Sequence, residues 1–151
     1  PPVAGLDGTP HLTSDDVLVM RALPERLLVI GAGPIGLELG QALSRLGSRV
    51  TIVEAAPTLL PGADPEIGEE LAALLADEGV ELIAGATVER ASTGPGGRPR
   101  LTITADDATR ELEGDALLLG AGRGPAVEAA RLEAAGVDGG PTGIPVDARL
   151  R

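Results

Sequence analysis

The 151-residue sequence contains no cysteine, no lysine and no phenylalanine, tyrosine or tryptophan. The absence of cysteine excludes disulfides, a thiol nucleophile and cysteine-based metal sites in this chain. The absence of lysine excludes Schiff-base catalysis and the lysine of a P-loop. Without aromatic residues, leucine, valine, isoleucine and alanine have to build the core, and no ring can stack on a bound ligand.

The charge is strongly unbalanced toward acidic residues, with a formal net charge of −11 at pH 7. Nucleic acids and anionic membranes require a basic surface, so we expect neither as a partner. With 43% hydrophobic and 23% charged residues, the composition is typical of one globular domain.

The ends of the chain suggest a piece of a larger protein. The sequence starts on Pro1-Pro2 without methionine and stops on "ARLR", which has no terminating feature. It contains no signal-peptide segment and no apolar run long enough to cross a bilayer. We therefore expect an excised part of a larger, cytoplasmic protein.

Three short apolar runs predict buried parallel strands. Each is bounded by turn or helix signals, which is the pattern of strands covered on both faces. They lie at residues 27–30, 50–53 and 81–84. Residues 1–25, ahead of them, are expected to form a connector with one weak helical stretch, capped by Ser14 or Asp15.

Two helices are predicted between these strands. The first would end at Gly47, because glycine is favoured just past a helix end. The second would start at the capping residue Asp64, continue through Pro65 and end at Gly79. The expected apolar faces consist of Ile35, Leu39, Leu43 and Leu46 in the first helix, and of Ile67, Leu71, Leu74 and Leu75 in the second.

The pattern changes after residue 84. Leu101 and Ile103 alternate with polar residues between the turn segments "TGPGGRP" and "ADDA", which predicts a small antiparallel meander. The segment "DALLLGAGR" then returns to a buried strand that ends in a glycine turn. The predicted fold class is α/β: a three-layer Rossmann-like domain, with a parallel sheet and an appended antiparallel β-meander.

The expected domain organisation has three parts. The connector at 1–25 would come from a missing domain. The Rossmann-like domain would occupy residues 26–123, and residues 124–151 would form a C-terminal segment that leads back toward the missing domain.

The segment "GAGPIG" fits the glycine fingerprint of dinucleotide-binding proteins. Gly31 allows the tight turn after the strand, Gly33 lets the backbone approach a pyrophosphate, and Gly36 lets the helix lie close to the strand. The phosphates would then meet free N–H groups at the positive end of the helix dipole. The alternative is that these are ordinary turn and packing glycines.

Glu54 ends the next predicted strand and indicates which dinucleotide is bound. A carboxylate at this place can accept both adenosine ribose hydroxyls and repels a 2′-phosphate. The following segment, "AAPTLL", contains no arginine that could accommodate such a phosphate. The sequence therefore predicts binding of NAD(H) in preference to NADP(H).

Several segments together resemble the NAD(P)H-binding domain of the FAD-dependent pyridine nucleotide–disulfide oxidoreductases, closest to their dihydrolipoamide dehydrogenase and mercuric reductase branch. They cover nearly the whole chain and include "LPERLLVIGAGPIGLELG", "RLGSRVTIVE", "DPEIGEEL", "EGVELI", "GAGRGP" and "IPVDARLR". The resemblance implies a parent enzyme that passes hydride from NAD(P)H to FAD and on to a disulfide or metal ion. FAD would be bound outside this segment, and the parent's FAD and dimerisation domains would be partners. Many mercuric reductases use NADPH, whereas Glu54 indicates NADH.

The resemblance also assigns roles to individual residues. Glu38 would bind the nicotinamide carboxamide, although a glutamate in the first helical turn is also favourable to the helix dipole. Arg123, at the end of a second glycine turn, would pass beside the cofactor or lie solvated. The full set of expected cofactor-binding residues is Gly31, Gly33, Pro34, Ile35, Gly36, Glu38, Glu54, Ala121, Gly122 and Arg123.

Other function classes remain open at this point. A free-standing nucleotide-binding or sensor module and another Rossmann enzyme, such as a methyltransferase, are alternatives. The sequence predicts no catalytic residue and no metal site, and the chain alone is expected to be inactive. His11 is interpreted as a loop residue, Asp106-Asp107 as a hairpin turn and Glu69-Glu70 as a solvated helix face.

Overall fold

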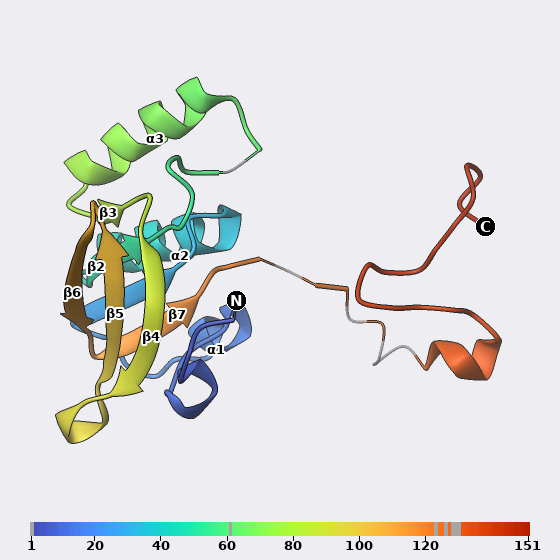
Figure 1. The fold of residues 1–151 in the computed structure, drawn as a ribbon, viewed down its shortest axis with the longest axis horizontal. Coiled ribbons are helices and arrows are strands. Elements are labelled where there is room, and N and C mark those ends of the chain that lie inside the picture. Colours follow the sequence, from blue (N-terminus) through green and yellow to red (C-terminus); the bar gives the residue numbers. More distant parts are fainter. Residues whose placement is uncertain (1, 61, 123, 126, 128–130) are drawn as a thin grey trace. The chain divides into compact units, whose positions relative to one another are not determined.

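A computed structural model describes residues 2–60, 62–122, 124, 125, 127 and 131–151 (Figure 1). The chain divides into two compact units, Pro1–Ala121 and Gly122–Arg151. Within the described residues, no helix is long and apolar enough to cross a membrane.

A four-stranded parallel sheet forms the centre of the first unit, with the strand order β3-β2-β1-β7. Strands β1 and β2 are its inner strands, and their apolar residues are almost completely buried, as expected for strands covered on both faces. The sheet confirms the strands predicted from the three apolar runs and from "DALLLGAGR". Their bounds are Arg26–Ile30 for β1, Arg49–Val53 for β2, Glu81–Ile83 for β3 and Ala116–Leu119 for β7.

The helices of this unit are α1 (Ser14–Leu18), α2 (Pro34–Arg45) and α3 (Pro65–Asp77). Helix α2 ends where Gly47 adopts a φ of 114° and donates to the carbonyl of Ser44 at 2.9 Å. Ser48 then donates to the carbonyl of Leu43 at 3.0 Å, which completes a Schellman motif.

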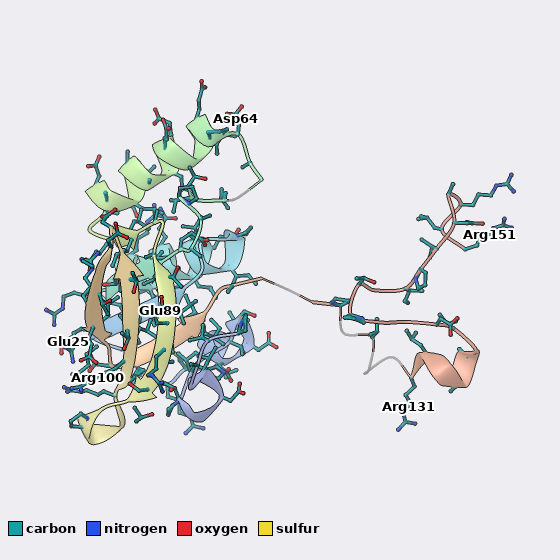
Figure 2. All side chains as sticks on the ribbon, viewed as in Figure 1. Glu25, Asp64, Glu89, Arg100, Arg131 and Arg151 are labelled. Carbon is teal, nitrogen blue, oxygen red and sulfur yellow. The ribbon has the colours of Figure 1, made fainter. Side chains whose placement is uncertain are left out.

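The predicted ends of α3 are also confirmed. Asp64 caps the helix by accepting from the Glu66 N–H at 3.2 Å, and Figure 2 shows Asp64 at the beginning of α3. At the other end, Gly79 has a φ of 85° and donates to the carbonyl of Ala76 at 2.9 Å. Helix α3 therefore begins and ends, and helix α2 ends, where the capping residues predict.

The predicted cap of α1 is wrong. Thr13, and not Ser14 or Asp15, is the capping residue. Its N–H and its hydroxyl both donate to the Asp16 carboxylate, at 2.8 and 2.7 Å. Asp16 is the third residue of the helix, so the pair forms a capping box that the sequence analysis did not consider.

The predicted apolar faces are partly wrong as well. Leu46 is 70% exposed, Ile67 56% and Leu74 47%. Helix α2 buries the predicted Leu43 together with Gly36, Leu37 and Gly40. A periodicity that counts only large apolar residues does not detect the two buried glycines.

A three-stranded antiparallel sheet, β4-β5-β6, forms a separate layer and confirms the predicted meander (Figure 1). Alternate residues of β5 are buried, as expected for a strand with one covered face. Asp106 and Asp107 join β5 to β6 with φ values of 50° and 58°, the backbone of a type I′ turn. The strands are β4 (Thr87–Thr93), β5 (Pro99–Ala105) and β6 (Ala108–Glu113).

Two aliphatic cores connect the three layers. One lies between the two sheets and includes Ile30 and Val53 of the parallel sheet together with Ile103 of β5. The other lies between the parallel sheet and the helices, and includes Ile52, Leu37 of α2 and Leu75 of α3. The structure therefore has the predicted α/β, Rossmann-like class, with helices on one face of the parallel sheet and the meander on the other.

Residues 2–25, the predicted connector, pack against the domain that follows them in the sequence. Leu12 donates to the carbonyl of Leu117 at 2.7 Å and accepts from the N–H of Leu119 at 2.9 Å, which adds a short parallel bridge beside β7. Ala4 makes a second bridge, to Arg90 of β4. Among the described residues, 3₁₀ helices are found at η1 (Leu6–Gly8), η2 (Pro95–Gly97) and, in the second unit, η4 (Leu132–Ala135).

Candidate functional site

The carboxyl ends of β1 and β7 lie side by side, and each strand is followed by the sequence Gly-Ala-Gly. The strands pair in register, with Ile30 opposite Leu119, and Gly120 donates to the carbonyl of Ile30 at 2.8 Å. Gly31 and Gly120 therefore begin two adjacent turns at the same edge of the sheet. Ligands of parallel α/β sheets bind at this edge.

Gly31 and Gly36 are required by the packing of the domain itself. Gly31 has a φ of 102°, and a Cβ on it would lie 2.8 Å from the Cα of Ala121. A Cβ on Gly36 would overlap the carbonyl oxygen of Gly31. The start of α2 therefore rests directly on the turn after β1, the arrangement expected from the glycine spacing.

Gly33 differs from these two glycines. Its φ is −77°, and the nearest atom to an added Cβ is the carbonyl oxygen of Gly120, at an ordinary contact distance of 3.7 Å. Neither backbone conformation nor crowding in the protein demands glycine at this position. The absence of a side chain leaves the backbone approachable from outside.

Gly120 is a further site residue that the sequence analysis did not single out. A Cβ on it would lie 2.7 Å from the Cα and 2.8 Å from the N of Gly36, and 3.2 Å from the carbonyl oxygen of Gly31. Gly31, Gly36 and Gly120 therefore form one close contact between two strands and a helix. The signal for Gly120 was the second Gly-Ala-Gly, which repeats the first one after another buried strand.

The N-terminus of α2 offers free backbone donors beside this contact. Gly33 is the N-cap without a side-chain cap bond, Pro34 is the first helical residue, and no acidic residue lies in the first turn. Among the described residues, the N–H groups of Gly33, Ile35 and Gly36 have no hydrogen-bond acceptor. Unpaired amides at the positive end of a helix dipole form an anion-binding geometry.

Glu54 lies at the end of β2 and is oriented by two backbone donors. Its Oε2 accepts from the Ala32 N–H at 2.6 Å, and its Oε1 accepts from the Ala56 N–H at 2.8 Å. The side chain is half-buried. Each carboxylate oxygen has two lone pairs, so each retains one acceptor direction beyond these bonds.

The β2–α3 connection reaches the same turn through Leu60, a residue that the sequence analysis did not include. The Leu60 N–H donates to the Ala32 carbonyl at 3.1 Å. Leu60 has a φ of 49°, which is uncommon for a residue other than glycine. Both backbone polar groups of Ala32 are therefore bonded, one to Glu54 and one to Leu60.

The other residues predicted to bind the cofactor are Glu38, Ala121, Gly122 and Arg123. Glu38 is exposed and is the fifth residue of α2, beyond the first helical turn, which weakens its interpretation as a dipole partner. Ala121 lies against Gly31, whereas Gly122 belongs to the second unit. Arg123 lies outside the described residues.

A group of arginine ion pairs lies at the other end of β1. Arg26, the first residue of β1, donates to Asp115, and Arg100 of β5 donates to Glu113 at 2.7 Å. Hydrogen bonding to Arg26 lowers the pKa of Asp115, and hydrogen bonding to Arg100 lowers the pKa of Glu113. Glu113 of β6 also lies 3.6 Å from Arg26 of β1, and this ion pair connects the two sheets at the end of β1 opposite the glycine turns.

Elsewhere among the described residues, the titratable side chains do not assemble into a second site. His11 Nδ1 bonds the Thr9 carbonyl at 2.8 Å within its own loop, and Glu69 and Glu70 are exposed on α3. Within the described part of the chain, no three histidine, aspartate or glutamate side chains are grouped so that they could hold a metal ion.

The fold and the paired glycine turns define a Rossmann-like α/β domain of the flavoprotein reductase type. The family model described as pyridine nucleotide-disulphide oxidoreductase matches residues 1–151, and the chain belongs to this family. This confirms, at the level of the family, the resemblance inferred from the sequence.

Individual relatives agree with this assignment. The chain is 39% identical over 140 residues to a mercuric reductase of Lysinibacillus sphaericus, covering 93% of this chain and 26% of the relative. It is 34% identical over 152 residues to the dihydrolipoyl dehydrogenase of Bacillus subtilis, covering 99% of this chain and 32% of the relative. The solved structure of the HOCl-induced flavoprotein disulfide reductase RclA from Escherichia coli matches with a TM-score of 0.83 and 36% identity, over 100% of this chain and 34% of RclA. The chain thus spans about a quarter to a third of these relatives.

Proposed function

We propose that this chain binds NAD(H) at the carboxyl edge of β1 and β2. In the parent protein it would present the nicotinamide to FAD, and electrons would pass on to a disulfide or a metal ion. The observation that carries the proposal is the convergence of free N–H groups at the start of α2 with the oriented carboxylate of Glu54. A dinucleotide needs a pyrophosphate site and a ribose site at the carboxyl edge of the sheet.

The residues present fit the cofactor. The amides of Gly33, Ile35 and Gly36 would donate to the pyrophosphate, and Pro34 would line it without competing as a donor. Glu54 would accept from the adenosine ribose with its remaining lone pairs, which favours NADH over NADPH. Ala121 and, from the family resemblance, Gly122 and Arg123 would lie beside the cofactor.

The family resemblance gives Glu38 the role of orienting the nicotinamide carboxamide. The bound nicotinamide supplies the hydride, and the protein supplies position and electrostatics. FAD would be held by parts of the parent protein outside these 151 residues, and cysteines for a disulfide would also have to come from there, since this chain has none. We therefore expect the chain to bind nucleotide without turnover. A dimeric, cytoplasmic parent protein is part of the same proposal.

Gly33 provides the sharpest test. Gly33→Ala adds a Cβ that the protein itself accommodates at 3.7 Å, so the free energy of unfolding should change by less than about 1 kcal/mol. The same Cβ would keep a pyrophosphate from the backbone, so we expect the Kd for NADH to rise at least about tenfold. Gly8→Ala is the matched control, because nothing lies within 4 Å of its added Cβ.

A titration of the purified chain with NADH, NADPH, FAD and S-adenosylmethionine separates the alternatives. We expect NADH to bind more tightly than NADPH, and FAD and S-adenosylmethionine not to bind. Tighter binding of NADPH would refute the role of Glu54. Binding of S-adenosylmethionine in place of NADH would support another kind of Rossmann enzyme.

A further inference from the structure

The connection between β2 and α3 touches the glycine turn at one point, Leu60. The Leu60 N–H donates to the carbonyl of Ala32 at 3.1 Å, and the Leu60 carbonyl accepts from the Ala63 N–H at 2.9 Å. Leu60 is therefore the first residue of a tight turn and at the same time a donor to the glycine turn.

The geometry of the peptide bond gives this contact a consequence for Gly33. The Ala32 carbonyl and the Gly33 N–H belong to one peptide unit, and in a trans peptide these two groups point in opposite directions. A bond that holds the carbonyl toward Leu60 therefore holds the Gly33 N–H away from Leu60. This N–H is one of the amides that have no acceptor among the described residues.

Without such an anchor, this peptide unit could turn over easily. Gly33 tolerates either sign of φ, so rotation of the Ala32–Gly33 peptide meets little steric resistance on that side. In the reversed orientation the carbonyl oxygen would face the anion site and repel a phosphate. The Ala32 N–H donates to Glu54, and this bond fixes the peptide unit between Gly31 and Ala32. The next unit, between Ala32 and Gly33, is fixed by the bond that the Ala32 carbonyl accepts from Leu60.

We propose that Leu60 is a positioning residue that locks the Ala32–Gly33 peptide with its N–H toward the pyrophosphate. The inference rests on the proposed function and adds to it a residue that does not itself touch the nucleotide. The uncommon φ of 49° at Leu60 is consistent with this role, because backbone strain persists where the surrounding structure holds it in place.

The neighbouring residues provide that support. Leu59 is only 5% exposed, and its carbonyl oxygen lies 2.9 Å from the place of a Cβ on Gly68 in α3. The side chain of Leu60 itself packs against the core between the parallel sheet and the helices. The left-handed residue thus follows a buried neighbour that lies against the first turn of α3.

The direct test removes only the Leu60 N–H. Replacing Leu60 by its α-hydroxy acid converts the amide to an ester and keeps the leucine side chain. The same replacement at Thr58, an exposed residue of the same connection, is the matched control. Binding of NADH, ADP-ribose and adenosine to the 151-residue chain is then measured by calorimetry or by NMR titration.

We expect the Leu60 ester to raise the Kd of NADH and ADP-ribose about five- to tenfold, since one anchoring hydrogen bond is lost. Adenosine, which has no phosphate, should change by less than about twofold, and the Thr58 ester should leave all three ligands unchanged. Equal weakening of adenosine would show a general structural effect and would overturn the proposal. Unchanged NADH binding to the Leu60 ester would also overturn it.

A side-chain variant separates the N–H from the leucine. Leu60→Asn keeps the N–H and suits the left-handed region, so it should bind NADH within about twofold of the unmodified chain even if its stability falls. Loss of NADH binding in Leu60→Asn with no effect of the ester would assign the role to the side chain. If the unmodified chain binds neither NADH nor ADP-ribose, the proposed function itself fails. This failure is distinct from a failure of the Leu60 proposal, which only the Leu60 variants test.

Discussion

The carboxylate of Glu54 lies 2.6 Å from the backbone N of Ala32 and so joins the end of β2 to the turn after β1. A charged acceptor makes this bond stronger than a bond between neutral groups. The second oxygen accepts from Ala56 at 2.8 Å, which fixes the plane of the carboxylate. One side chain thus shapes the glycine turn and, in the proposed function, selects the cofactor.

Glu54→Gln is predicted to affect both properties. A glutamine has one acceptor oxygen and one donor NH₂, so it cannot accept from Ala32 and Ala56 at the same time. We expect the Kd for NADH to rise about tenfold and the preference for NADH over NADPH to shrink, as measured by parallel titrations at one ionic strength. Glu81→Gln, at the start of β3, removes the same charge away from the glycine turns and should leave the preference intact. An unchanged preference in Glu54→Gln would remove Glu54 from cofactor selection.

Gly120→Ala is predicted to destabilise the domain. The added Cβ would lie 2.7 Å from the Cα of Gly36, which is backbone and cannot move aside as a side chain can. Overpacking of this kind costs about 1–3 kcal/mol in the free energy of unfolding, measurable by denaturant titration. Gly33→Ala, in the neighbouring turn after β1, is expected to keep its stability and to bind NADH more weakly. The two variants therefore separate the glycine needed for packing from the glycine needed for binding.

The sequence was sufficient to predict most of the fold, because the decisive signals are local. Short apolar runs identify the parallel strands, Asp64 and Gly79 define the ends of α3, and the Asp106-Asp107 turn defines a hairpin. These features depend on a few neighbouring residues, whose conformational preferences hold in most contexts.

The candidate site was predicted less completely, because part of it depends on contacts that are distant in sequence. Gly120 meets Gly36 only when β7 pairs with β1, and Leu60 reaches Ala32 only through the path of the β2–α3 connection. The exposure of Leu46 was missed for a related reason, since the covered face of α2 includes Gly36 and Gly40 as well as Leu37 and Leu43. Residue type alone does not show which backbones come into contact.

Glu38→Gln is predicted to affect the nicotinamide half of the ligand alone. Glu38 is exposed on the second turn of α2, where its carboxylate could accept from a carboxamide NH₂. We expect the Kd of NADH to rise about two- to fivefold, because one solvent-exposed hydrogen bond is weakened. The Kd of ADP-ribose, which has no nicotinamide, should be unchanged. An equal rise in the Kd of NADH and of ADP-ribose would contradict a role of Glu38 at the nicotinamide. Glu69→Gln, on α3, is the control for the change in charge.

The ion pairs of Glu113 and Asp115 with neighbouring arginines are predicted to make stability depend on pH. Hydrogen bonding to Arg100 lowers the pKa of Glu113, with smaller contributions from Arg26 and Arg98. Hydrogen bonding to Arg26 likewise lowers the pKa of Asp115. A carboxyl whose pKa is lower in the folded chain stabilises the fold above its unfolded pKa, and this contribution is lost as the pH falls toward the folded pKa.

The free energy of unfolding should therefore decrease as the pH drops below about 4.3, the ordinary pKa of a glutamate. Glu113→Gln keeps the size of the side chain but removes the charge that faces Arg100 at 2.7 Å. We expect this variant to be less stable at pH 7 and to lose less stability than the unmodified chain between about pH 5 and pH 3, measured by denaturant unfolding at each pH.

The control for the change in net charge is Glu111→Gln, at an exposed residue two positions earlier on β6. If the free energy of unfolding falls equally with pH in Glu113→Gln and in the unmodified chain, other carboxylates dominate the acid unfolding. A smaller fall in Glu113→Gln alone would assign that part of the pH dependence to the contact between Glu113 of β6 and Arg100 of β5.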